Sequence, residues 1–200
     1  MAKDAPEVDA GMCFGGEIGG EAEERIKKDQ EFVKKLEEDY TEVKFRWGRE
    51  RFSYRLKNGV PTIFLGQPCD NFALLALHEL GHALCKHKDY KIDVERIKIE
   101  SAAWGTAKTA LLKYYGRAFR CDNLLKDEIL MGEFSGEEGV KDSELAKILP
   151  KWDEDFVQEK LDTYRDWLHA KSKCKKCGLT GYQTKDGKYH CPRCEAFILS

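Results

Sequence analysis

The sequence predicts an α+β protein in which a small mixed sheet packs on helices and a cysteine-rich module follows near the C-terminus. Three patterns support this fold class. Apolar residues have helical spacing in several segments, residues 43–65 alternate in polarity as strands do, and two C-x-x-C pairs lie beyond residue 170. We expect a flexible N-terminal segment at 1–20, a main domain at 21–170 and the cysteine module at 171–200.

Composition and charge exclude several classes of protein. The formal net charge is -2, so the whole chain is not a polycation that binds nucleic acid by charge alone. No run of 18 or more apolar residues occurs, and the first residues lack the pattern of a secretory signal. We therefore expect an intracellular, cytoplasmic protein with no membrane contact, whose eight cysteines are mostly thiols or metal ligands.

The first half of the chain predicts a helix, three strands and a second helix. Residues 21–40 predict an amphipathic helix, and strands are expected near 43–47, 51–56 and 60–65, with an Asn58-Gly59 turn. A helix capped by Asp70 or Asn71 should end near Lys88 and be buried, because its first turns are apolar on every side.

The remaining elements are mostly helical. A second helix is expected from Asp93 to a stop at Gly116. Residues 117–150 predict short helices and loops, and residues 151–170 another amphipathic helix before the cysteine module.

The segment HELGHALCKH, residues 78–87, predicts a metal site. His78 and His82 lie one helical turn apart, so both imidazoles can reach one ion. Glu79 lies beside them and can take a proton from a water whose pKa the ion has lowered to about 7. The alternative is a pair of hydrogen-bonded helix histidines, but an apolar helix has little reason to bury these three polar groups together.

A catalytic zinc needs a third protein ligand. His87 lies five residues beyond His82 and should point elsewhere on the helix, which leaves Glu95 and Glu100 of the next helix. An antiparallel return helix brings Glu100 level with His82. Small residues on its face, Ala103, Ala107 and Ala110, would let the two helices approach closely.

These residues carry a family resemblance. HELGH followed by Glu100-Ser-Ala-Ala-Trp-Gly-Thr-Ala107 resembles the ImmA/IrrE zinc metallopeptidases, whose pattern pairs HExxH with E-x-E-A-x-x-x-A. Ala102 replaces the family's second glutamate, and Trp104 stands where a small polar residue is common. The resemblance covers residues 43–115 and implies a zincin-like, gluzincin fold, a phage-related or stress-linked regulatory substrate, and peptide binding along an edge strand at residues 60–65.

Three further residues near this site have a side chain of possible chemical use. Tyr114 shares the broad face of Glu100 and is a candidate donor to the oxyanion of the transition state, with Tyr90 as the other choice. Cys85 is expected to be a buried thiol rather than a fourth ligand. The remaining cysteines outside the C-terminal module, Cys13, Cys69 and Cys121, are read as ordinary thiols.

The C-terminal cysteines predict a zinc ribbon. Cys174, Cys177, Cys191 and Cys194 form two C-x-x-C pairs that can hold one structural zinc ion, and residues 185–188 predict a hairpin turn. Residues 171–195 carry seven basic residues against two acidic ones, with Tyr182, Tyr189 and His190 interleaved. The ribbon can therefore bind nucleic acid, or serve protein contact or stability instead.

Three functions remain open. The first is an intracellular zinc metallopeptidase with one catalytic and one structural Zn²⁺, acting on a protein or peptide substrate. The second is a protease resembling the SprT-like, DNA-associated enzymes, which join HExxH to a zinc ribbon but use a histidine as third ligand. The third is a non-enzymatic zinc-binding adaptor for nucleic acid or protein, although Glu79 would then have no role.

Overall fold

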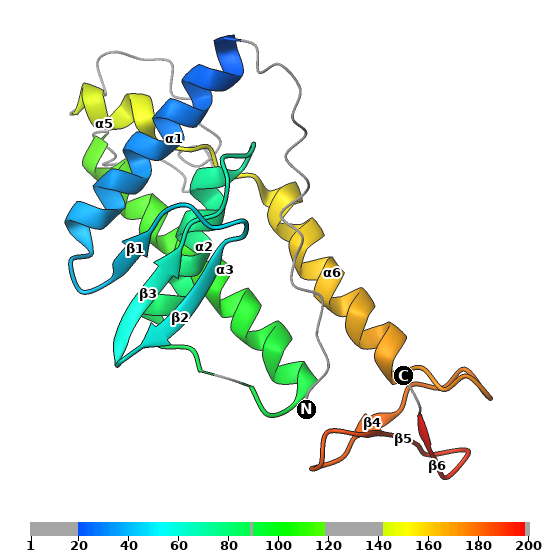
Figure 1. The fold of residues 1–200 in the computed structure, drawn as a ribbon. Coiled ribbons are helices and arrows are strands. Elements are labelled where there is room, and N and C mark those ends of the chain that lie inside the picture. The colour runs from blue at the N-terminus through cyan, green and yellow to red at the C-terminus, as the bar shows by residue number, and fades with distance from the viewer. Residues whose placement is uncertain (1–19, 89, 119–141, 199–200) are drawn as a thin grey trace. The chain divides into compact units, whose positions relative to one another are not determined.

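The computed structural model describes residues 20–88, 90–118 and 142–198, and within them the protein is a mixed α+β structure (Figure 1). The predicted N-terminal segment, except for Gly20, and most of the region 117–150 lie outside the described residues. Contacts divide the described residues into two units, one with residues 20–87, 102–118 and 142–153, and the other with residues 88, 90–101 and 154–198. Helix α3, Asp93–Ala118, is one helix with residues in both units, and it continues past the predicted stop at Gly116.

The unit containing residues 20–87 holds a three-stranded sheet and most of the helices. Its elements are α1 (Gly20–Asp39), β1 (Lys44–Arg46), β2 (Ser53–Lys57), β3 (Val60–Phe64), α2 (Phe72–Leu84), the later part of α3 and α5 (Ser143–Ile148). Helix α2 packs on β2, β3 and α1. These boundaries match the predicted strands and the first predicted helix within two residues, whereas α2 begins as predicted and ends earlier.

The strand order corrects one expectation. The order is β1-β3-β2, with β1 parallel and β2 antiparallel to β3, so residues 60–64 form the central strand. Both sides of β3 are therefore paired, and it cannot accept a substrate peptide as an edge strand. The alternating pattern did not reveal this, because parallel pairing of β1 depends on a crossover rather than on a hairpin turn.

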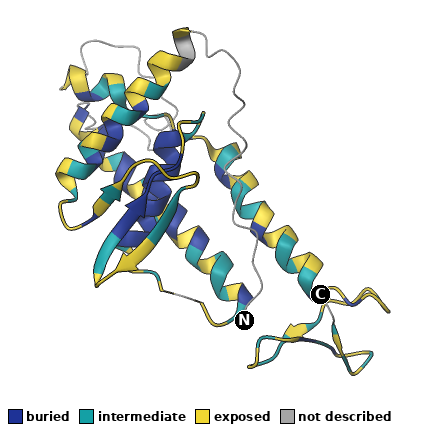
Figure 2. Ribbon diagram, viewed as in Figure 1, coloured by how far each residue is buried: buried dark blue, intermediate teal, exposed yellow. Residues whose placement is uncertain are grey.

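Helix α2 is the centre of the core. Residues 72–83 are all buried, and Figure 2 shows this burial on α2 and on β3. Its start is capped from α1 rather than by its own neighbours. Asn71 makes no side-chain capping bond and Asp70 pairs with Arg25, whereas the buried Asp29 accepts a hydrogen bond from the backbone N–H of Ala73. Burial raises the pKa of Asp29 to about 6 despite this bond.

The end of α2 is a tight reversal. Lys86 has a φ of 52°, and the backbone N–H groups of Lys86 and His87 donate to the carbonyls of Ala83 and His82. These two bonds are those of a Schellman cap, in which a left-handed residue follows the helix. The helix therefore ends at Leu84, earlier than the predicted Lys88, and His87 folds back toward the last turn.

The other unit contains the start of α3, helix α6 (Glu154–Ser172) and a second sheet of β4 (Tyr182–Gln183), β5 (Tyr189–Cys191) and β6 (Ala196–Ile198). The sheet is antiparallel in the order β4-β5-β6, and Gly187, with a φ of 83°, lies in the predicted turn between β4 and β5.

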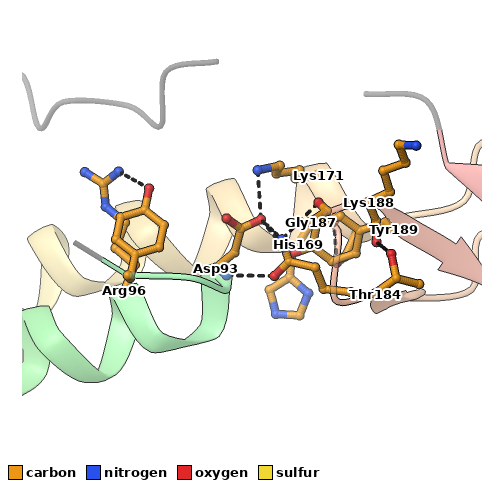
Figure 3. A network of polar contacts seen from close by, with 11 residues as sticks. Asp93, Arg96, His169, Lys171, Thr184, Gly187, Lys188 and Tyr189 are labelled. Carbon is orange, nitrogen blue, oxygen red and sulfur yellow. Dashed lines mark hydrogen bonds and ion pairs between the residues drawn. The ribbon is translucent and has the colours of Figure 1, made fainter. Parts of the chain in front are cut away.

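Asp93 joins the first turn of α3 to this sheet (Figure 3). Its buried carboxylate accepts hydrogen bonds from Tyr189 Oη at 2.9 Å and Gln183 Nε2 at 3.2 Å, and pairs with Lys171 Nζ at 2.8 Å. Its backbone N–H donates to Gln183 Oε1 at 2.7 Å. The carboxylate raises the pKa of Tyr189, together with burial of the phenol.

Among the described residues, no helix is long and apolar enough to cross a membrane.

Candidate metal centres

The three predicted ligands of the first site lie together. The ligand atoms of His78, His82 and Glu100 are all within 4.8 Å of one another, and all three residues are buried. The Nε2 atoms of His78 and His82 are 3.1 Å apart. Tetrahedral zinc, bound at about 2.0–2.1 Å, places its nitrogen ligands about 3.3 Å apart. This donor set therefore fits one zinc ion, although the structure does not identify the metal.

Close helix packing makes this convergence possible. A Cβ on Gly81 of α2 would lie 2.2 Å from the carbonyl oxygen of Ala103 on α3, so only glycine fits at this crossing. Ala103 and Ala107 are fully buried, and Ala110 is nearly so. The predicted close approach is confirmed at Ala103. Gly81 also permits the close approach of α2 and α3. This role was not predicted from its position inside the HExxH motif.

His87 contacts His82, contrary to the expectation that it points elsewhere. The Nδ1 atoms of the two rings are 2.9 Å apart. If His82 donates this hydrogen bond, its Nε2 carries the lone pair toward His78 and a metal. The prediction failed because it assumed that the helix continued through residue 87, whereas the left-handed Lys86 returns the chain to His82.

Two aromatic rings cover the histidines. Trp104 stacks on His78 with ring centroids 4.2 Å apart, and Tyr54 of β2 lies parallel to His82 at 6.3 Å. Burial raises the pKa of the Tyr54 phenol, so it remains a hydrogen-bond donor at neutral pH. Tyr54 could not be predicted from the sequence, because its nearness to His82 depends on the packing of β2 against α2.

Glu100 has a cationic neighbour on its own helix. Arg96 Nε lies 3.9 Å from Glu100 Oε1, one turn away. The Arg96 guanidinium stands over the rings of Tyr164 and Trp167 of α6, at 5.0 and 5.8 Å from their centroids, and donates to Tyr90 Oη at 3.1 Å. These aromatic contacts restrict the guanidinium and hold it beside Glu100.

Of the two other predicted site residues, Glu79 lies on the helix of the two histidines and Tyr114 lies far from them. Glu79 is buried on α2 between the two histidines in sequence. Tyr114 lies fourteen residues beyond Glu100 on α3, about 21 Å along the helix axis. Its ring packs on Phe32, and Asp39 and burial together raise its pKa. The structure does not bring Tyr114 to the metal ligands.

Cys85 is exposed rather than buried, which corrects the prediction. It is the C-cap of α2, and its Sγ lies 3.1 Å from Thr106 Oγ1. Its backbone is still helical, with its N–H donating to the Gly81 carbonyl at 3.0 Å, but at the C-cap of the helix the thiol is open to solvent. Cys69 is half-buried and forms no disulfide with another described residue, and Cys13 and Cys121 lie outside the described residues.

The four C-terminal cysteines also lie together. Their sulfurs are within 4.8 Å of one another, with Cys174–Cys194 at 3.9 Å and Cys177–Cys191 at 3.5 Å. Zinc–sulfur bonds of about 2.3 Å place tetrahedral thiolates about 3.8 Å apart. The backbone N–H groups of Cys177 and Lys176 lower the pKa of Cys174 to about 6, which favours the thiolate that a metal binds.

No protein-family model matches this chain, and neither a curated protein nor a solved structure matches it.

Proposed function

We propose that this protein is a zinc-dependent metallopeptidase of the gluzincin type, resembling the ImmA/IrrE enzymes, with a structural zinc ion in a C-terminal ribbon. The observation that carries the proposal is the convergence of His78, His82 and Glu100, with Glu79 buried on the same helix as the two histidines. Three protein ligands leave a fourth coordination position open, as a catalytic zinc requires.

Each residue has a separate role in the proposed reaction. Zinc at this site would act as a Lewis acid and lower the pKa of a water molecule. Glu79 accepts the proton of that water and passes it to the leaving amine. Tyr54 takes the donor role that the sequence assigned to Tyr114, because its ring lies against His82 and its phenol stays protonated. Arg96 places a positive charge one helical turn from Glu100, with Nε 3.9 Å from Oε1.

The substrate is a protein or peptide segment that binds in an extended conformation. Among the described residues, β2 pairs only with β3, so its other edge offers backbone groups to an added strand. The same strand carries Tyr54, which lies against His82. A peptide paired with residues 53–57 would therefore pass close to the catalytic residues, and this edge replaces residues 60–65 as the proposed binding strand.

The third ligand favours this proposal over a SprT-like protease, whose third ligand is a histidine. In the described part of the chain, the one metal-binding group that contains His78 and His82 is completed by Glu100. His169, the remaining histidine outside the motif and the ribbon, is exposed on α6.

The Glu79→Gln variant separates an enzyme from a zinc-binding adaptor. We expect it to keep the zinc content of the wild type and to lose about 10²–10⁴-fold of the hydrolysis rate, because it lacks the general base. The assay measures cleavage of denatured casein and of a quenched fluorescent peptide library. Tyr54→Phe should lower kcat with unchanged zinc content. Equal cleavage by wild type and Glu79→Gln, or no cleavage of either substrate by the zinc-loaded wild type, would contradict the proposal.

A further inference from the structure

The sheet of the ribbon has an aromatic row across one face. Tyr182, His190 and Phe197 come from three different strands and are direct cross-strand partners, since Tyr182 pairs with His190 and His190 with Phe197. Their rings are in contact, with both centroid distances equal to 5.5 Å. The two outer rings are each 55% exposed.

The opposite face of the same sheet is already occupied. Side chains alternate along a strand, so Gln183 and Tyr189 point away from the aromatic row. Both bind Asp93, and Tyr189 and Cys191 are buried. The ribbon thus uses one face for its attachment to α3 and for its metal ligand. The stability of the ribbon does not explain why large aromatic side chains remain exposed on the other face.

The ribbon is rich in positive charge, and one of its lysines lies at the aromatic row. Lys188 Nζ stands 5.5 Å from the centroid of the Phe197 ring, which places it on the same face of the sheet, and it also pairs with Asp186 Oδ2 at 3.3 Å. The other exposed basic residues of the ribbon are Lys173, Lys175, Lys176, Lys185 and Arg193. Asp186 and Glu195 are the only acidic residues between 171 and 195, so the ribbon has a strong excess of positive charge in a chain that is slightly negative overall.

From this face we infer that the ribbon binds single-stranded nucleic acid, with bases stacked on Tyr182 and Phe197 and phosphates held by Lys188 and its basic neighbours. Exposed aromatic rings on a small sheet offer stacking surfaces to unpaired bases, and the basic residues supply the complementary charge for the backbone. A duplex cannot use the rings in this way, because its bases are already stacked. The inference does not depend on the proposed peptidase activity.

The test measures binding of the full-length, zinc-loaded protein to fluorescein-labelled oligo(dT), oligo(U) and a duplex of equal length by fluorescence anisotropy. We expect a single strand to bind more tightly than the duplex, and comparison of the dT and U strands distinguishes DNA from RNA. Tyr182→Ala and Phe197→Ala should each weaken binding about tenfold, the usual loss for one stacked base. Lys188→Ala should lower the slope of log K against log salt by about 0.7.

Two controls make the result specific. Leu179→Ala removes an exposed apolar side chain of the ribbon outside the aromatic row and should leave binding unchanged. Glu79→Gln should also bind as the wild type does, which separates this inference from the proposed catalysis. Native mass spectrometry should find the wild-type zinc content in every variant.

Three results would overturn the inference. The first is equal binding of duplex and single strand, which would indicate a purely electrostatic contact. The second is wild-type affinity in the Tyr182→Ala and Phe197→Ala variants. The third is no binding of any oligonucleotide at low salt, which would assign the aromatic face to a different partner, such as a protein.

Discussion

The two groups of metal-ligating residues are built in opposite ways. His78, His82 and Glu100 are side chains of long helices, and the helix that carries both histidines is buried along almost its whole length. The four cysteines are held by a ribbon of three strands, none longer than three residues. In the ribbon, residues 173–198, the buried residues are Cys174, Tyr189 and Cys191.

This difference shows whether the folded protein positions the metal ligands or the metal ion folds the protein. At the histidine–glutamate group the apolar core fixes the helices, so the ligands are positioned before a metal binds. At the cysteine group too little apolar surface is buried to fold the ribbon, so metal binding must supply the folding free energy. The first arrangement is suited to catalysis and the second to structure. The predictions below test this contrast.

The largest effect is expected in the ribbon. Cys191→Ser should abolish zinc binding there and unfold the ribbon, because structural zinc contributes roughly 10–16 kcal/mol of binding free energy in small zinc domains. Limited proteolysis should then cleave between residues 173 and 198. The main thermal transition should move by less than about 4 °C, a shift that corresponds to about 1 kcal/mol in a chain of this size. Loss of the main transition would show that the helical part depends on the ribbon metal.

The next largest effect is expected at the helix crossing. Gly81→Ala places a Cβ against the Ala103 carbonyl, and relief of this overlap must separate α2 from α3. We expect a loss of about 1–3 kcal/mol in the free energy of unfolding and weaker zinc binding at the histidine–glutamate group.

Gly105→Ala is the matched control for this change. Gly105 is an exposed residue of the same helix pair, and an added Cβ there meets no atom within 4 Å. Alanine should stabilise the helix by about 0.5–1 kcal/mol. Denaturant unfolding measures both variants. Equal effects of the two substitutions would contradict the claim that close packing positions the ligands.

A smaller effect is expected from the contact between His87 and His82. His87→Ala removes the partner of His82 Nδ1 and should weaken zinc binding about 10- to 100-fold at the histidine–glutamate group alone. Competition with a fluorescent chelator measures the two affinities separately. His169→Ala changes an exposed histidine of α6 and should alter neither affinity. An unchanged zinc affinity of the histidine–glutamate group in His87→Ala would show that His87 does not support the metal ligands.

A pH-dependent effect is expected at the cap of α2. Because the pKa of Asp29 is raised to about 6 in the folded protein from an ordinary value of 3.8, the folded state keeps this proton over a pH range in which the unfolded state loses it. Stability from this group is therefore lost as the pH rises from about 4 to about 6.

Asp29→Asn removes this titration and should retain an acceptor for the Ala73 N–H. Relative to the wild type, it should gain on the order of 1–3 kcal/mol of unfolding free energy as the pH rises from about 4 to about 7. Urea unfolding at several pH values measures this difference. A difference that does not change with pH would contradict the burial of an ionisable Asp29.

The sequence predicted the parts of the sites that depend on periodicity within one element. The i, i+4 spacing of His78 and His82, the small face around Ala103 and the two cysteine pairs all follow from such local rules. The choice of Glu100 over Glu95 required only that the second helix return antiparallel. Glu95 instead accepts the N–H groups of Lys91 and Ile92 before α3.

The sequence did not predict features that depend on the path of the chain between elements. A non-glycine residue in the left-handed region, Lys86, ended α2 early, and this changed the position of His87. The parallel pairing of β1 made β3 central and placed Tyr54 on an edge strand against His82. Neither the left-handed conformation of Lys86 nor the parallel pairing of β1 with β3 is marked by a strong pattern in the local sequence.

The most direct test of the account is the zinc content of Glu100→Gln and Glu95→Gln, measured by native mass spectrometry beside the wild type. The account predicts two zinc ions in the wild type, two in Glu95→Gln and one in Glu100→Gln, with the remaining ion in the ribbon. Two tightly bound ions in Glu100→Gln would contradict the claim that this carboxylate joins His78 and His82 around a single metal ion.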